Sequence, residues 1–282
     1  MIAWLTDPLA QRIVVRGIVE LTLIGIVSGG LGCWIVLAGR SYSAESLAHA
    51  MLPGLVLASL LGVPLLLGGA AGLLVGAVLI ALVGRVPRLD GDVAVSVVIT
   101  SLFGLGVLLG LAPEVPAGLN GILFGDVLGV TDLDIALAAG LAVGVVAVLA
   151  VLHPSLLVTG FDRLNARALG RSPAALDVVL ALLLAAATLV AVQALGNLLV
   201  VAMLVGPAAT ARLLTRRMAP MMLTATAVAV AAAVGGLYAS YHARVAAGAA
   251  VTLALVGCFL FALLARWVAQ ATASARPQAV RS

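Results

Sequence analysis

Long apolar runs alternate with short polar breaks along almost the whole of this 282-residue chain. A bilayer core is crossed by roughly 20 apolar helical residues, so we predict one membrane-spanning helix for each run. The predicted spans are residues 13–38, 46–62, 64–84, 93–112, 133–152, 175–194, 196–212, 220–240 and 246–268. Because the break at Gly196-Asn197 is weak, eight spans, or one broken helix, stay open as alternatives to nine.

Composition agrees with an all-α, polytopic membrane protein that forms a single domain over residues 1–282. Hydrophobic residues make up 64% of the chain and charged residues only 9%, which is too little charge for a soluble domain of this length. All 15 basic residues are arginines, and the lack of lysine excludes a Walker-type nucleotide site. Any ATP that drives this protein must therefore be hydrolysed by another chain.

The arginines predict the orientation of the chain, because cytoplasmic loops of membrane proteins are enriched in basic residues. If the loop at 159–172 is cytoplasmic, twelve of the 15 arginines fall on that side, with the N-terminus outside and the C-terminus inside. The loop at 113–134 carries acidic residues but no arginine, which suits the outside. The arginines form no basic tract interleaved with aromatic residues, so we expect a lipid membrane as partner and no nucleic acid.

The stretch from Ser43 to Gly54 carries two ionisable residues at the start of an apolar run. Glu45 and His49 are four residues apart and therefore share one helix face, where a carboxylate and an imidazole can hold a divalent cation. Pro53 has no N–H to donate to the carbonyl of His49. Ionisable groups inside a membrane span are costly and often mark a transport pathway, whereas a structural pair near the lipid headgroups is the alternative.

Two further polar segments interrupt the apolar pattern. Residues 159–170 predict a short amphipathic helix ended by glycine, with Phe161 and Leu164 on its apolar face. Such a helix either docks another protein or lies on lipid headgroups, and the sequence leaves both open. The pair Gly206-Pro207 predicts either a break in a helix that lines a cavity or a simple proline kink.

Four motifs resemble those of the permease subunits of zinc, manganese and iron ABC importers, the ABC-3 permeases. The first runs from Arg40 to Gly54 and includes Glu45, His49 and Pro53, where the family has Asp, His and Pro. The others are Leu-Phe-Gly-Asp-Val-Leu at 123–128, Phe-Asp…Ala-Arg-Ala-Leu-Gly at 161–170, and Pro-Ala-Ala-Thr-Ala-Arg at 207–212. They fall in family order, and the resemblance covers residues 11–268.

The resemblance implies a metal-chelate-type ABC importer permease in a bacterial cytoplasmic membrane. It implies a homodimer with two ATPase subunits, which bind the ATP, and an extracytoplasmic solute-binding protein. The transported ion would be zinc, manganese or iron, held by Glu45 and His49, which a two-fold axis would bring together with a second pair. Helix 159–170 would couple to the ATPase through Phe161, Asp162, Arg163, Leu164, Arg167 and Gly170. Residues expected at the gate or along the pathway are Pro53, Asp126, Pro207 and Arg244, with loop anchoring favoured for Asp126.

Departures from the family pattern leave the cargo open. Glu45 replaces the family's Asp, Ala48 replaces a Ser, and Arg244 stands where an acidic residue is usual. A metal chelate or haem is therefore the alternative cargo. An ATP-independent carrier or channel is the alternative class, but it leaves the 159–170 helix unexplained. We expect no enzyme, because the chain lacks the His-Glu-x-x-His spacing of zinc proteases.

Overall fold

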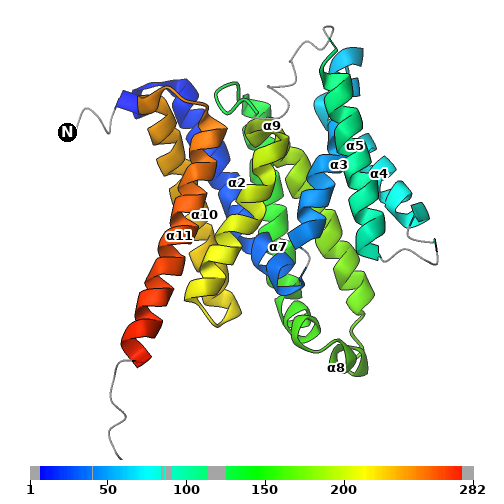
Figure 1. Ribbon diagram of the computed structural model, residues 1–282, viewed down its shortest axis with the longest axis vertical. Helices are drawn as coiled ribbons and strands as arrows, with labels where there is room; N and C mark the ends of the chain where they lie inside the picture. Colours follow the sequence, from blue (N-terminus) through cyan, green and yellow to red (C-terminus); the bar gives the residue numbers. More distant parts are fainter. Residues whose placement is uncertain (1–6, 40, 84–85, 87–90, 113–124, 275–282) are drawn as a thin grey trace, which may run out of the picture.

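The structure is a computed structural model that describes residues 7–39, 41–83, 86, 91–112 and 125–274. Within these ranges the side chains of residues 42–45, 197–198 and a few other positions lie outside the description. The described part contains helices and short connections, without strands. The helices are α2 (Arg12–Leu37), α3 (Ser41–Leu61), α4 (Leu65–Val83), α5 (Gly91–Gly110), α7 (Asp132–Phe161), α8 (Arg163–Ala168), α9 (Pro173–Leu214), α10 (Met218–Ala243) and α11 (Ala247–Ser274) (Figure 1).

The all-α class is confirmed, and every predicted span lies on a helix. Five of the described helices are long and apolar enough to cross a membrane, and four shorter apolar helices accompany them. The number of crossings, eight or nine, stays a prediction. Helix α7 is longer than the predicted span 133–152, because it continues through Pro154 to Phe161. Leu156 and Thr159 in this extension are buried, so packing compensates for the hydrogen bond that the proline removes.

Helix α9 folds back on itself at Gly196. This residue has φ 71° and ψ 167°, a conformation that essentially only glycine adopts. Before the turn, Asp177 lines a cavity together with Leu37 at the end of α2. After the turn, the Arg212 guanidinium donates a hydrogen bond to the carbonyl of Val36 at 3.1 Å. Both ends of α9 therefore meet the same end of α2, and its two halves run antiparallel (Figure 1).

Of the two alternatives for Gly206-Pro207, a break or a proline kink, the break is not observed, because the helix continues through Pro207 to Leu214. The backbone of α9 departs from helical geometry at Gly196 instead. The Thr210 hydroxyl donates to the carbonyl of Gly206 at 2.8 Å, which gives this carbonyl a second partner next to the proline. A proline in a helix removes one backbone hydrogen bond, and close packing around Pro207, which is buried, tolerates that loss.

Helix α2 forms the centre of the fold. In the most apolar stretch of α2, 67% of the residues are buried, whereas only 22% are buried in the corresponding stretch of α7. Helix α2 is therefore an interior helix and α7 a peripheral one. Glycines on α2 allow neighbouring backbones to approach closely, as small residues commonly do in membrane proteins. A Cβ on Gly29 would lie 2.5 Å from the Cα of Thr226 on α10, and one on Gly32 would meet the carbonyl of Leu204 on α9.

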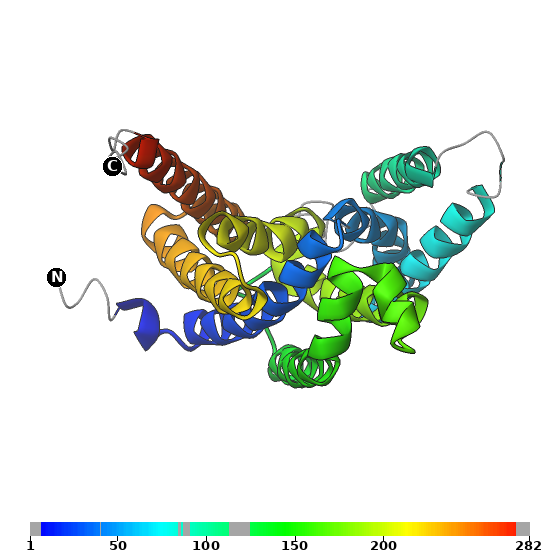
Figure 2. The same cartoon turned by 90° about the horizontal axis from the view of Figure 1, so that it is seen from below.

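Helices α3, α4 and α5 form a second group beside this core. Gly54 of α3 and Gly68 of α4 leave no room for a Cβ, because each would meet the other's carbonyl. Seen from below, α4 and α5 lie on the opposite side of the molecule from α10 and α11 (Figure 2). Helix α3 is the member of this group that packs extensively on α9, so it connects the group to the core.

The outer surface of the peripheral helices is apolar. Val143 and Val151 on α7 and Leu253 and Phe261 on α11 are each more than 70% exposed. Such a surface is unfavourable in water but matches the hydrocarbon core of a bilayer, where backbone polar groups are satisfied within helices. The exposed apolar side chains on α7 and α11 are therefore suited to contact lipid.

Candidate functional site

His49 lies between α3 and α5. It is eight residues after the start of α3 at Ser41, which places it about 12 Å along the helix at 1.5 Å per residue. Its imidazole is half-buried and packs edge-on against the Phe103 ring of α5, with ring centroids 4.8 Å apart and an interplanar angle of 60°. Ala48 and Ala50 on either side are buried. The histidine is therefore held at a helix interface and not at a helix end.

The other two predicted residues of this stretch also lie on α3. The backbone of Glu45 is helical, one turn before His49, whereas its side chain is outside the described part of the chain. Pro53 is buried, and α3 continues through it without a break. Among the described residues no group of three His, Cys, Asp or Glu side chains lies close enough to hold a metal ion. The described part of one chain thus provides only part of a metal site.

The predicted amphipathic helix is shorter than expected, because α7 extends to Phe161 and α8 occupies Arg163–Ala168 alone. Asp162 separates the two helices and caps the second one. Its carboxylate accepts hydrogen bonds from the backbone N–H groups of Leu164 at 2.9 Å and Asn165 at 3.0 Å. This arrangement satisfies two N–H groups that a helix start leaves without intrahelical partners.

Helix α8 lies at the end of the molecule where α2 and α7 end (Figure 1). Apolar side chains are exposed on α8 and on Phe161, the last residue of α7. Phe161 is 76% exposed and Leu164 is 77% exposed, while Ala166 is fully buried. Arg167 lies exposed in the last turn, and Gly170 follows with φ 72°. A small apolar surface with basic neighbours, outside the predicted spans, is suited to contact with another protein.

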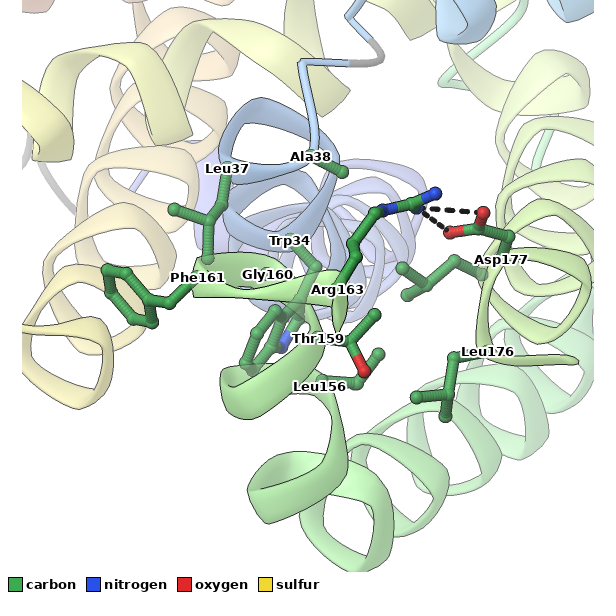
Figure 3. A pocket seen from close by; sticks show the side chains of 11 residues that line it. Trp34, Leu37, Ala38, Leu156, Thr159, Gly160, Phe161, Arg163, Leu176 and Asp177 are labelled. Carbon is green, nitrogen blue, oxygen red and sulfur yellow. Dashed lines mark hydrogen bonds and ion pairs between the residues drawn. The ribbon is translucent and has the colours of Figure 1, made fainter. Parts of the chain in front are cut away.

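Arg163 of α8 forms an ion pair with Asp177 of α9. One guanidinium nitrogen, Nη2, donates to both carboxylate oxygens, at 2.7 and 2.8 Å (Figure 3). The pair borders a cavity of about 300 Å³ between the ends of α2 and α7 and the start of α9. Asp177 did not emerge from the sequence as a candidate. The available signal was an acidic residue within the first turns of an otherwise apolar span, shortly after Arg171.

The segment at 125–130 packs against the turn of α9. The N–H of Asp126 points to the carbonyl of Gln193 at 3.5 Å, and its carboxylate accepts from the N–H of Gly129 at 2.9 Å. A Cβ on Gly125 would lie 2.6 Å from the carbonyl carbon of Leu195, so only glycine fits here. Asp126 itself is exposed. Its contacts fix the 125–130 segment against α9, at the end of the molecule opposite α8.

The remaining predicted residues are separated from one another. Arg244 lies in the connection between α10 and α11, where it is exposed and adopts a left-handed conformation with φ 54°. No described carboxylate pairs with it, whereas Arg16 at the start of α2 pairs with Asp132 of α7 at 2.7 Å. Pro53 and Pro207 are buried inside α3 and α9. Of the four residues predicted at the gate or along the pathway, Asp126 and Arg244 therefore lie in connections, and Pro53 and Pro207 lie within helices.

Comparison with known sequences matches residues 10–266 of the chain to the ABC 3 transport family. The manganese transport system membrane protein MntC of Listeria innocua is 35% identical over 249 residues, covering 88% of this chain and 89% of the relative. The probable iron transport system membrane protein of Haemophilus influenzae is 31% identical, covering 93% of this chain and 97% of that protein.

Comparison with solved structures finds a protein of the same fold. The structure of PsaBC from Streptococcus pneumoniae in complex with Fab superposes with a TM-score of 0.85. The two chains are 30% identical, and the match covers 93% of this chain and 95% of the other. The family match therefore includes α3 with His49, α8 with its capping residue and the fold-back of α9. This chain belongs to the ABC 3 transport family.

Proposed function

We propose that this chain is the membrane-spanning permease subunit of an ATP-driven importer of divalent metal ions, located in a bacterial plasma membrane. The observation that carries the proposal is the continuous match of residues 10–266 to the ABC 3 transport family. Relatives that share about a third of the sequence over nearly the full length are named as manganese and iron transport proteins. The apolar exterior of the helices supports the membrane location.

The permease acts with other subunits. It has no lysine and hence no Walker-type site, so two ATPase subunits hydrolyse the ATP on its behalf. Helix α8 is the contact for an ATPase, which is supported by the exposed apolar side chains of Phe161 and Leu164 and by Arg167 beside them. A solute-binding protein delivers the ion at the opposite end. The whole chain forms one transmembrane domain.

Glu45 and His49 contact the transported ion. His49 is held at the interface between α3 and α5, and Glu45 shares its helix face one turn away. Two ligands from one chain hold a metal weakly, and a second copy related by a two-fold axis would supply two more. Four nitrogen and oxygen ligands suit Mn²⁺, Fe²⁺ and Zn²⁺. Pro53 and Pro207 line the pathway, and Asp126 and Arg244 lie near its outer gate.

Manganese is the first cargo to test and iron is the second, because both metals appear in the names of relatives. The permease is purified with its ATPase and binding protein, reconstituted in liposomes, and supplied with Mn²⁺, Fe²⁺ or Zn²⁺ in separate reactions. ATP-dependent uptake of at least one ion is expected. Equal uptake without ATP would favour an ATP-independent carrier and contradict the proposal.

Two variants test the metal contact. His49→Ala and Glu45→Ala should each lower uptake at least tenfold, while assembly and basal ATP hydrolysis stay close to those of the parent. His242→Ala is the matched control, because it removes a half-buried histidine at the end of α10 that we assign no role in binding. Parent-level uptake in the Glu45→Ala/His49→Ala double variant would refute the assignment of the site.

A further inference from the structure

Helix α8 has few attachments to the rest of the molecule. It is six residues long, and of its side chains only Ala166 is buried. Asp162 connects it to α7 through a non-helical residue with φ −148° and ψ 102°. A force applied to the exposed side chains of α8 can therefore turn it relative to α7, unless a side-chain contact holds it to the helix bundle.

The space behind α8 is a cavity and not a packed interface. Its volume is about 300 Å³, and its walls come from the ends of α2 and α7 and the start of α9 (Figure 3). Trp34 and Thr159 are among the residues that line it, and the indole N–H and the hydroxyl of these residues are buried without a hydrogen-bond partner among the described residues. With Arg163 and Asp177 in its walls, a cavity of this size is roomy and polar enough to admit water. Apolar packing therefore does not fix α8 to α9 at this place.

The ion pair between Arg163 and Asp177 spans this region. Its two hydrogen bonds of 2.7 and 2.8 Å are charge-assisted, which makes them stronger and more directional than neutral ones. The Asp177 side chain is only 20% exposed, so the carboxylate is fixed within α9, whereas the Arg163 side chain is 52% exposed. The pair is thus a direct side-chain contact from α8 to α9.

The first half of α9 connects this contact to the other end of the molecule. The helix is uninterrupted from Asp177 to Gln193, about 24 Å at 1.5 Å per residue. The carbonyl of Gln193 lies 3.5 Å from the N–H of Asp126 in the 125–130 segment. Gly125 packs against the backbone of α9 immediately before its turn. A shift of this half-helix would therefore displace the 125–130 segment.

We propose that the Arg163–Asp177 ion pair transmits the movement of α8 to the first half of α9, which makes Asp177 a positioning residue for transport. This inference rests on the proposed function, because α8 moves only if an ATPase binds it. Asp177 itself lies on α9 and reaches α8 through its bonds to Arg163. Its role is to make the 125–130 segment at the outer end follow the ATPase cycle.

The test measures Mn²⁺ uptake per ATP hydrolysed in liposomes that contain the full complex. Asp177→Arg and Arg163→Asp each place like charges together, and each is expected to lower this ratio at least fivefold while ATP hydrolysis continues. The double variant Arg163→Asp/Asp177→Arg restores the pair in reverse and should recover at least half of the parent ratio. Arg171→Ala is the matched control, because it removes an exposed charge between α8 and α9 that forms no described ion pair.

Recovery in the double variant shows that the effect acts through the pair. The ratio of uptake to ATP hydrolysis separates transmission from folding, because a loss of folded complex lowers uptake and hydrolysis together and leaves their ratio unchanged. A parent-level ratio in Asp177→Arg, or no recovery in an assembled double variant, would overturn the inference. If Asp177→Arg does not assemble, the isosteric Asp177→Asn takes its place, and a parent-level ratio in that variant also overturns it. A parent complex without ATP-dependent uptake of Mn²⁺, Fe²⁺ or Zn²⁺ would instead refute the proposed function.

Discussion

Replacing Gly29 with alanine should destabilise the protein, because α2 and α10 meet through their backbones at this position. The added Cβ would lie 2.5 Å from both the Cα and the N of Thr226, whereas ordinary contacts begin at 3.4 Å. Neither atom can rotate away, so the helices must separate by most of the missing distance. Overpacking of a well-packed core costs about 1–3 kcal/mol, and the upper end applies to a clash between backbones.

Alanine also favours the helix over glycine by about 1 kcal/mol, which leaves a net loss of about 2 kcal/mol. For a domain of more than 150 residues each kcal/mol shifts Tm by about 2–4 °C, so Gly29→Ala should lower Tm by about 4–8 °C. Thermal unfolding of the detergent-purified protein, followed by tryptophan fluorescence, measures this shift. Trp34 is a suitable reporter because it is buried on the same helix.

The neighbouring Gly30 provides the control. A Cβ on Gly30 would have its nearest contact, the Cδ1 of Leu149, at 3.5 Å, which is an ordinary distance. Gly30→Ala therefore keeps the gain in helix propensity without the clash and should raise Tm by about 2–4 °C. The reasoning would be refuted if Gly29→Ala were as stable as the parent, or if both substitutions changed Tm in the same direction.

Two further substitutions test local features of the fold. Thr131→Ala breaks the capping box of α7, in which the Thr131 hydroxyl accepts from the N–H of Asp134 at 3.3 Å and the Asp134 carboxylate accepts from the N–H of Thr131 at 2.9 Å. The loss of about 1 kcal/mol should lower Tm by about 2–4 °C. Thr131→Ser keeps the hydroxyl and should leave Tm unchanged. Equal Tm values for the two variants would show that the Thr131 side chain does not stabilise the start of α7. The double variant Phe161→Asp/Leu164→Asp should keep the parent Tm, because both side chains are more than 70% exposed, yet lose the ATPase on co-purification. Full retention of the ATPase would count against α8 as the docking helix.

The helices could be predicted from the sequence because each apolar run must satisfy its backbone polar groups internally within a bilayer. The bounds were less predictable where packing outweighs a local signal. Helix α7 passes through Pro154, and α9 passes through Pro207, because neighbouring helices stabilise both segments. The turn at Gly196 was the weakest break in the pattern, since a single glycine among apolar residues is also compatible with a continuous helix.

The candidate site was predictable in part. Ionisable residues in an apolar run are energetically costly, so Glu45 and His49 could be identified as candidates from the sequence. The structure places His49 at an interface between helices. The partner of Arg163 could not be predicted in this way. Asp177 is 14 residues away along the chain, beyond the end of α8 and a turn, so only the spatial arrangement of α8 and α9 brings the two charges together.

The fold-back at Gly196 also determines where the helices after α9 begin. Because α9 turns back, it ends at the end of the molecule from which it started, and α10 begins there. A straight α9 would instead place the start of α10 at the opposite end of the molecule. The backbone conformation of one glycine therefore decides at which end of the molecule α10 begins, and a residue with a Cβ at this position would put the placement of α10 and α11 at risk.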